Sequence, residues 1–120
     1  MKKILLTFIC IFFLIGCSSN DSTNNLISYM EAKEKIINEN AILVDVRTEE
    51  EYNEDHIDGA TSLPLSNINE TNIKDITTTK DDIIIVYCQS GNRSSQALTL
   101  LKDLGYKNVY DLDSINNWQE

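Results

Sequence analysis

The sequence predicts an α/β fold with a parallel sheet, and three observations support that prediction. Two continuous apolar runs, 41–46 and 83–87, have the length of strands that are covered on both faces. A segment with helical signals follows each run, at 48–53 and at 94–104. Strands that alternate with helices favour a parallel sheet, because two parallel strands need a long crossover between them.

The first helix is expected to begin after Ser28. Ser28 and Glu31 have the spacing of a capping box, in which each residue's side chain accepts a hydrogen bond from the other's backbone N–H. A short strand at 26–27 is expected to precede this helix. The helix offers an apolar face made of Met30, Ala32, Ile36 and Ile37.

The next elements surround the apolar run at 41–46, which is expected to be a central strand. Thr48 and Glu51 repeat the capping pattern and predict a short acidic helix through Asn53. Segment 61–65 is expected to be extended, but Pro64 argues against a central strand there, because proline has no backbone N–H to donate. Signals between 66 and 80 are weak.

The clearest strand is 83–87, and it runs directly into Cys88. A helix is predicted over 94–104, where apolar residues recur at helical spacing, and Gly105 is suited to end it. A last strand at 109–112 and a terminal turn that carries Trp118 complete the predicted domain.

The first sixteen residues are interpreted as a signal peptide. A positive head precedes the apolar run 4–15, which is shorter than the roughly 20 residues that a spanning helix needs. The sequence at 14–17 resembles the lipobox of bacterial lipoproteins, so residues 1–16 would be removed and Cys17 lipidated; an ordinary signal peptide is the less favoured alternative. Residues 17–25 would then form a flexible tether and 26–120 the domain, held extracytoplasmically on a bacterial membrane.

Charge and cysteine content narrow the function. Without residues 1–16 the chain keeps eight basic and nineteen acidic residues, a net charge of −11 that argues against nucleic-acid binding. Cys10 would be lost with the signal peptide and Cys17 acylated, so Cys88 has no partner for a disulfide. A lone thiol outside the cytoplasm favours a chemical role.

The segment 88–93 has the features of a reactive-cysteine loop. It lies between a strand and a helix, so the helix N-terminus points towards Cys88 and favours its thiolate form. Gly91 permits a curled loop with converging amides, Arg93 supplies positive charge suited to an oxyanion, and Ser94 is expected to cap the helix or to lend its hydroxyl to the pocket.

Several motifs, taken in order, resemble the rhodanese homology domain. They are Asp45–Val46–Arg47, Glu51–Tyr52, His56–Ile57–Asp58–Gly59–Ala60, Leu63–Pro64 and Tyr87–Cys88 with Gly91, Arg93 and Ser94. The resemblance implies a three-layer fold, with a five-stranded, mainly parallel sheet and helices on both faces. It also implies that Cys88 is the catalytic residue and that the substrate is bound by Gln89, Ser90, Gly91, Asn92 and Arg93.

The implied activity is sulfur transfer. Cys88 would take a sulfane sulfur from a small anionic donor, thiosulfate or polysulfide, as a persulfide and pass it to a thiol or cyanide. Asp45, Arg47 and Ser94 would support the loop from behind. No cofactor and no metal site is expected, since the sequence has neither metal-ligand spacing nor a phosphate-binding glycine pattern, and the protein is expected to be a monomer.

Two alternatives to a sulfurtransferase remain open. A phosphatase or arsenate reductase also uses a loop between Cys and Arg, but with five intervening residues, whereas four separate Cys88 from Arg93. A membrane-anchored persulfide carrier without small-molecule turnover would keep the same loop. The chain also departs from the family pattern at Asp55, where glycine is usual, and at Asp113–Ser114, where a glycine pair commonly precedes the last tryptophan.

For four further features we favour a structural role over a functional one. His56 is expected to stabilise a turn and not to act as a base for Cys88. Asp45 and Arg47 are expected to form a buried ion pair, and Trp118 to close the core. The acidic residues near 49–55 are expected to be a solvated helix face and not a cation site.

Overall fold

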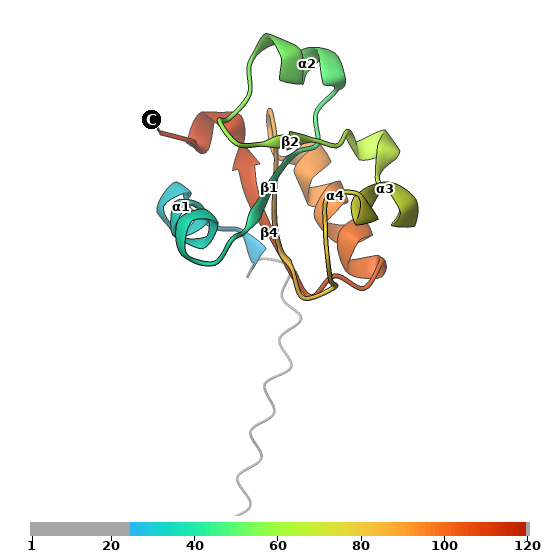
Figure 1. The fold of residues 1–120 in the computed structure, drawn as a ribbon. Helices are drawn as coiled ribbons and strands as arrows, with labels where there is room; N and C mark the ends of the chain where they lie inside the picture. The colour runs from blue at the N-terminus through green and yellow to red at the C-terminus, as the bar shows by residue number, and fades with distance from the viewer. Residues whose placement is uncertain (1–24, 120) are drawn as a thin grey trace, which may run out of the picture.

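The computed structural model describes residues 25–119, and Figure 1 shows a single sheet between helices. Residues 1–24, with the predicted signal peptide and Cys17, lie outside this range. The elements in chain order are α1 (Tyr29–Asn38), β1 (Ile42–Asp45), α2 (Glu49–Glu54), β2 (Thr61–Ser62), the 3-10 turn η2 (Leu65–Asn67), α3 (Glu70–Lys74), β3 (Ile83–Cys88), α4 (Asn92–Asp103), β4 (Asn108–Ser114) and the 3-10 turn η3 (Ile115–Asn117).

The sheet has four strands in the order β2-β1-β3-β4, and every neighbouring pair is parallel. The prediction of five strands is therefore wrong by one. The segment at 26–27 forms an isolated parallel bridge, Leu26 with Asp111, at the outer side of β4. It cannot extend into a strand, because Ser28 already caps α1. The short β2 lies at the other edge, where the following Pro64 costs no sheet hydrogen bond.

Local sequence explains where the first two helices begin. Both predicted capping boxes are confirmed: Ser28 and Glu31 exchange hydrogen bonds at the start of α1, and Thr48 and Glu51 do so at the start of α2. Each box satisfies backbone N–H groups that have no partner inside the helix. The six-residue α2 thus starts at a defined position and aims Glu51 in a fixed direction.

The prediction of an apolar face on α1 is correct for two of its four residues and wrong for the other two. Ala32 is fully buried and Ile36 packs against the core, but Met30 and Ile37 are 70% and 66% exposed. Residues four apart lie on one side of a helix, so Ala32 and Ile36 share the side that meets the sheet. Met30 and Ile37 share the other side. Among residues 25–119, no helix is long and apolar enough to cross a membrane.

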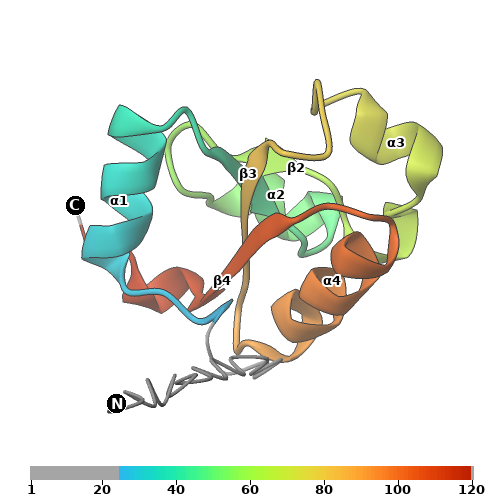
Figure 2. The same ribbon diagram turned by 90° about the horizontal axis from the view of Figure 1, so that it is seen from below.

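The core has two halves, one on each face of the sheet. Figure 2 shows α1 on one side of the strands and α4 on the other. Side chains alternate along β3, so Val86 and Cys88 face the half formed with α4, whereas Ile85 and Tyr87 face the half formed with α1. All four of these side chains are fully buried. The three-layer arrangement that the sequence predicted is therefore present.

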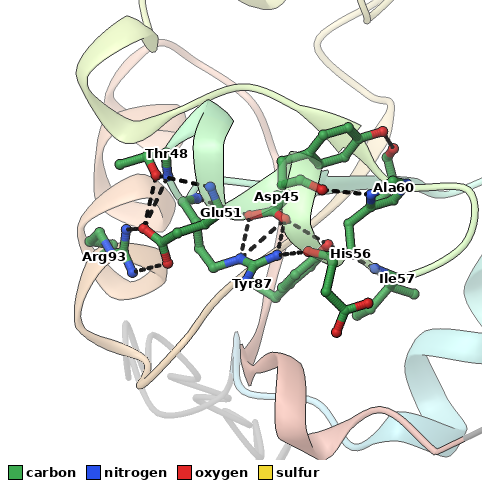
Figure 3. A network of polar contacts seen from close by, with 11 residues as sticks. Asp45, Thr48, Glu51, His56, Ile57, Ala60, Tyr87 and Arg93 are labelled. Atoms are coloured by element: carbon green, nitrogen blue, oxygen red, sulfur yellow. Dashed lines mark hydrogen bonds and ion pairs between the residues drawn. The ribbon is translucent and has the colours of Figure 1, made fainter.

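A buried polar network joins the carboxyl ends of β1 and β3, and Figure 3 shows it from close by. Arg47 and Asp45 form the predicted buried ion pair, with 2.7 Å between Nη2 and Oδ2. The Tyr87 hydroxyl donates to Asp45 Oδ2 at 2.9 Å and accepts from the Ile57 N–H at 3.2 Å. Burial raises the pKa of Tyr87, so this hydroxyl stays protonated and keeps donating. Arg47 also donates to the Asp55 carbonyl at 2.6 Å.

Replacing Tyr87 with Phe tests what this network contributes. The Tyr87→Phe variant leaves the buried Ile57 N–H without an acceptor and removes one donor from Asp45. We expect a loss of about 2 kcal/mol in the free energy of unfolding, measured by urea denaturation. Tyr110→Phe is the matched control, since the half-buried Tyr110 ring lies beside Lys35 and its hydroxyl makes no hydrogen bond within the described residues. Equal stability of the two variants would contradict the expectation.

Candidate functional site

The site is built where β3 ends and α4 begins. Cys88 is the last residue of β3, and the loop residues Gln89, Ser90 and Gly91 lead into α4 at Asn92. Gly91 is the N-cap of α4 and has φ 90°, a backbone conformation that favours glycine. The helix therefore starts two residues before Ser94, where the sequence predicts its start. This tighter connection places its first turn directly beside the thiol.

Two backbone N–H groups converge on the sulfur of Cys88. The Gly91 N–H lies 2.9 Å from Sγ, and the Ser94 N–H lies 3.3 Å from it. Cys88 is fully buried and is the free cysteine of the described residues. Because these amides have no partner inside α4, the sulfur takes the place of a capping group at a helix N-terminus. That arrangement stabilises negative charge on sulfur.

The hydroxyl of Ser94 lies beside the sulfur of Cys88. Ser94 does not cap α4; its hydroxyl lies 3.4 Å from Cys88 Sγ and donates to the Gly91 carbonyl at 3.1 Å. The side chain is fully buried. A hydroxyl next to the sulfur can accept from a thiol or donate to a thiolate, so it suits both protonation states of Cys88.

The remaining loop residues lie nearer to solvent. Gln89, Ser90 and Asn92 are exposed. The Gln89 carbonyl accepts a hydrogen bond of 2.6 Å from the Ser114 hydroxyl at the end of β4. Asn92 accepts from Gln96, one turn further along α4. The side chains of Gln89 and Ser90 are thus free to meet a ligand, while the backbone of the loop is fixed by β4.

The side chain of Arg93 forms an ion pair that the sequence did not predict. Figure 3 shows its guanidinium facing Glu51 of α2, with contacts of 2.6 Å and 3.0 Å. The hydrogen bond from Arg93 lowers the pKa of Glu51 to about 2, and the same bond raises the pKa of Arg93. Both side chains are about one-third exposed, at 33% and 32%. The loop's positive charge is therefore present but already shared with a carboxylate.

Asp113, at one of the two family departures, lies against the loop. Its backbone has φ 76°, which is uncommon for a residue other than glycine. The pairing of β3 with β4 shifts register here, so that Val86 faces Asp111 but Tyr87 faces Asp113. A Cβ atom on Gly91 would lie 1.5 Å from Asp113 Oδ1. The carboxylate thus occupies the space that a side chain at position 91 would need.

Asp111 supports this turn from inside. Its carboxylate accepts a 2.7 Å hydrogen bond from the backbone N–H of Asp113, and burial raises the pKa of Asp111. A pocket of about 300 Å³ lies beside the loop, and its lining includes Gly91, Ser95, Asp111 and Asp113. Two carboxyl groups therefore line the cavity next to the candidate site.

Two other candidate residues, His56 and Trp118, make contacts that support the fold. His56 stacks on Tyr52, with 3.8 Å between ring centroids, and its Nδ1 lies 2.8 Å from the Tyr52 carbonyl. Trp118 packs on the core edge-to-face with Tyr29, as expected of a closing aromatic. In the described part of the chain, no three metal-ligating side chains are grouped in a way that could hold an ion.

The sequence did not predict that Glu51 pairs with Arg93, and it assigned no role to Asp113. The run of acids at 49–51 favours a solvated helix face for all three residues and does not by itself single out Glu51. Its capping position was the one available signal, because a residue that reaches back over the helix start is held in one orientation. Asp113 was marked as a departure from the family pattern, and that signal did point to the loop.

The fold and the loop define a class: a parallel α/β domain with a cysteine thiol held at a helix N-terminus. The chain belongs to the rhodanese-like domain family, whose profile matches residues 28–120. The thiosulfate sulfurtransferase PspE of Escherichia coli is 38% identical over 66 residues, which cover 55% of this chain and 62% of PspE. The chain thus spans under two-thirds of that relative.

Further relatives differ in length and in name. Thiosulfate sulfurtransferase GlpE of Coxiella burnetii is 33% identical to this chain, and the match covers 72% of this chain and 78% of GlpE. A tRNA uridine(34) hydroxylase of Buchnera aphidicola is 36% identical over 74% of this chain, but only 30% of the hydroxylase is covered. The names of PspE and GlpE support a sulfurtransferase family, and the hydroxylase carries the domain as a part.

Solved structures agree on the fold. A rhodanese with anions from E. coli superposes with a TM-score of 0.61 at 32% identity, covering 64% of this chain and 89% of that one. The human single-domain sulfurtransferase TSTD1 gives a TM-score of 0.62 at 26% identity, covering 72% of this chain and 87% of that one. The rhodanese-like α/β fold is therefore shown independently of the sequence motifs.

Protonation of Glu51 should break its ion pair with Arg93. Since the pKa of Glu51 is lowered from 4.5 to about 2 by folding, the pair contributes stability that is complete above about pH 4.5 and is lost as pH falls through about 2. Glu51→Gln keeps the capping box but not the charge. We expect it to cost about 0.5–1 kcal/mol in unfolding free energy at pH 7, because the pair is partly solvated, and less as the pH falls below about 4.5.

The measurement is urea unfolding of the wild type and Glu51→Gln from pH 7 down to the lowest pH at which both remain folded. Glu50→Gln is the control, because Glu50 is exposed and forms no ion pair among residues 25–119. A stability difference that stays constant between pH 7 and pH 3 would count against the ion pair as its cause.

Proposed function

We propose that this protein is a sulfurtransferase in which Cys88 carries the transferred sulfur as a persulfide. The observation that supports this most strongly is the sulfur itself, which is fully buried and faces two free backbone amides at the start of α4. A nucleophilic sulfur needs a stabilised thiolate, and those amides supply the stabilisation without any added base.

In the first step the thiolate of Cys88 attacks the sulfane sulfur of an anionic donor such as thiosulfate or a polysulfide. With thiosulfate, a bond forms between Cys88 Sγ and the sulfane sulfur. The bond between the two donor sulfurs breaks, and sulfite leaves with its electron pair. The product is a persulfide anion on Cys88, so no proton and no external oxidant is required.

In the second step a thiolate or cyanide attacks the outer sulfur of the persulfide. The bond between that sulfur and Sγ breaks, and Cys88 regains its thiolate. The outer sulfur leaves as an organic persulfide or as thiocyanate. The amides of Gly91 and Ser94, together with the Ser94 hydroxyl, stabilise the negative charge on Sγ in the thiolate that begins and ends the cycle.

Arg93 is proposed to bind the anionic part of the donor. Its ion pair with Glu51 keeps the guanidinium at the loop, and one-third of its side chain is exposed and accessible to a ligand. Gln89, Ser90 and Asn92 would add polar contacts from the exposed side of the loop. Because one chain supplies every residue of this site, the protein is proposed to act as a monomer.

A persulfide carrier is the second candidate, and exposed loop residues around a buried sulfur are compatible with a protein donor and acceptor. A phosphatase or arsenate reductase is less favoured. Four residues separate Cys88 from Arg93, one fewer than in the loop of those enzymes.

Replacing Cys88 with Ser should abolish sulfur transfer. We expect the purified full chain to transfer sulfur from thiosulfate to cyanide and to gain the mass of one sulfur atom, and Cys88→Ser to do neither. Thiocyanate formation and intact-protein mass measure the two effects. An adduct without turnover would favour the carrier, and turnover that survives in Cys88→Ser would contradict the role of Cys88.

The protein is further proposed to be a lipoprotein that is anchored through Cys17 on the extracytoplasmic side of a bacterial membrane. The support is the lipobox-like sequence at 14–17 after an apolar run. In a bacterial host, Cys17→Ser should lose incorporation of labelled fatty acid and leave the membrane fraction. Cys10→Ser is the control and should stay in that fraction. Membrane association that is unchanged in Cys17→Ser would exclude the anchor.

A further inference from the structure

We propose that Asp113 determines donor selectivity at the Cys88 loop: its carboxylate disfavours the dianion thiosulfate relative to sulfane donors that carry less charge. This inference rests on the proposed sulfurtransferase function and names the substrate class of the same site. It follows from the conformation of Asp113, from its position against Gly91, and from the charges around it.

Asp113 has a backbone conformation that residues other than glycine rarely adopt. A φ of 76° costs free energy for a residue with a Cβ atom, and aspartate is one of the few residues that tolerate it. The register shift between Val86 and Tyr87 produces this turn and aims the side chain. Strain of this kind is kept where the surrounding structure fixes it, and it is common at functional sites.

The carboxylate is close to the reacting sulfur. Gly91 N lies 2.9 Å from Cys88 Sγ, and a Cβ built on Gly91 would lie 1.5 Å from Asp113 Oδ1. Since only two covalent bonds separate that nitrogen from such a Cβ, Oδ1 can be no more than about 8 Å from the sulfur. This is within one Debye length at physiological salt, about 8 Å, so the charge acts on any donor that reaches Cys88.

Within residues 25–119, no cation is paired with this charge. Asp113 forms no ion pair among residues 25–119, and Arg93, the cation of the loop, is bound to both oxygens of Glu51. The neighbouring Asp111 adds a carboxyl group and no positive charge. A donor therefore meets a loop in which the guanidinium of Arg93 is paired with Glu51 and the carboxylate of Asp113 has no ion-pair partner within residues 25–119. Each additional negative charge on the donor increases its repulsion by Asp113.

A comparison of two donors separates the effect of donor charge from that of the sulfur-transfer reaction itself. Thiosulfate is a dianion, and methanethiosulfonate is a monoanion in which a methyl group replaces one charged oxygen. In both, the Cys88 thiolate attacks the sulfane sulfur and the sulfur–sulfur bond of the donor breaks. Sulfite leaves in one case and methanesulfinate in the other, each with the electron pair. The ratio of kcat/KM for the two donors therefore reports on charge at the site.

The experiment measures that ratio in the full chain purified in detergent, with cyanide as acceptor, at low and at high ionic strength. Asp113→Asn keeps the shape and tolerates the same backbone conformation, and Asp113→Gly also removes the strain. We expect both variants to raise the ratio of thiosulfate to methanethiosulfonate about tenfold at low salt, and less at high salt.

Asp103→Asn is the matched control. It removes the same charge from an exposed position at the far end of α4, which is about 15 Å away along the helix, and should leave the ratio unchanged. An unchanged ratio in both Asp113 variants, with Cys88-dependent transfer intact, would overturn this inference alone. Absence of transfer from either donor in every protein would overturn the proposed function and the inference with it.

Discussion

The carboxylate of Asp45 is buried at the carboxyl end of β1, and it accepts hydrogen bonds from the backbone and guanidinium of Arg47 and from the hydroxyl of Tyr87. Burying a charge is costly unless it is paired, and removing one partner of such a pair costs about 3–5 kcal/mol. The three groups must therefore stay together. They fix β1 against β3 and, through the Ile57 N–H and the Asp55 carbonyl, they fix the segment after α2 as well.

The position of Cys88 follows from this constraint. Neighbouring residues of a strand point to opposite faces, so a Tyr87 that is fixed on the α1 side directs Cys88 to the α4 side. There the sulfur meets the amides of Gly91 and Ser94. On the opposite side of the same network, α2 begins only four residues after Asp45 and carries Glu51 to Arg93. One buried network thus orients both the sulfur and the cation of the loop.

The sequence predicted those parts of the fold that depend on neighbours in the chain. The capping boxes at Ser28 and Thr48 need residues three apart, and the burial of 83–88 needs only a continuous apolar run. Contacts between distant segments were not predictable in the same way. Glu51 and Arg93 are 42 residues apart, and no local pattern marks them as partners. The strand count failed at 26–27, where a competing local signal, the cap at Ser28, ends the pairing.

The two arginine–carboxylate pairs differ in what a ligand can do to them. The Arg47–Asp45 pair has side-chain exposures of 5% and 0%, so no ligand can replace either partner without exposing a buried charge. The Arg93–Glu51 pair has exposures of 33% and 32% and lies beside the loop. Because water already competes for that pair, an anion can share the guanidinium with Glu51. The fold thus has one arginine–carboxylate pair that is closed to solvent and a second that solvent and ligands can reach.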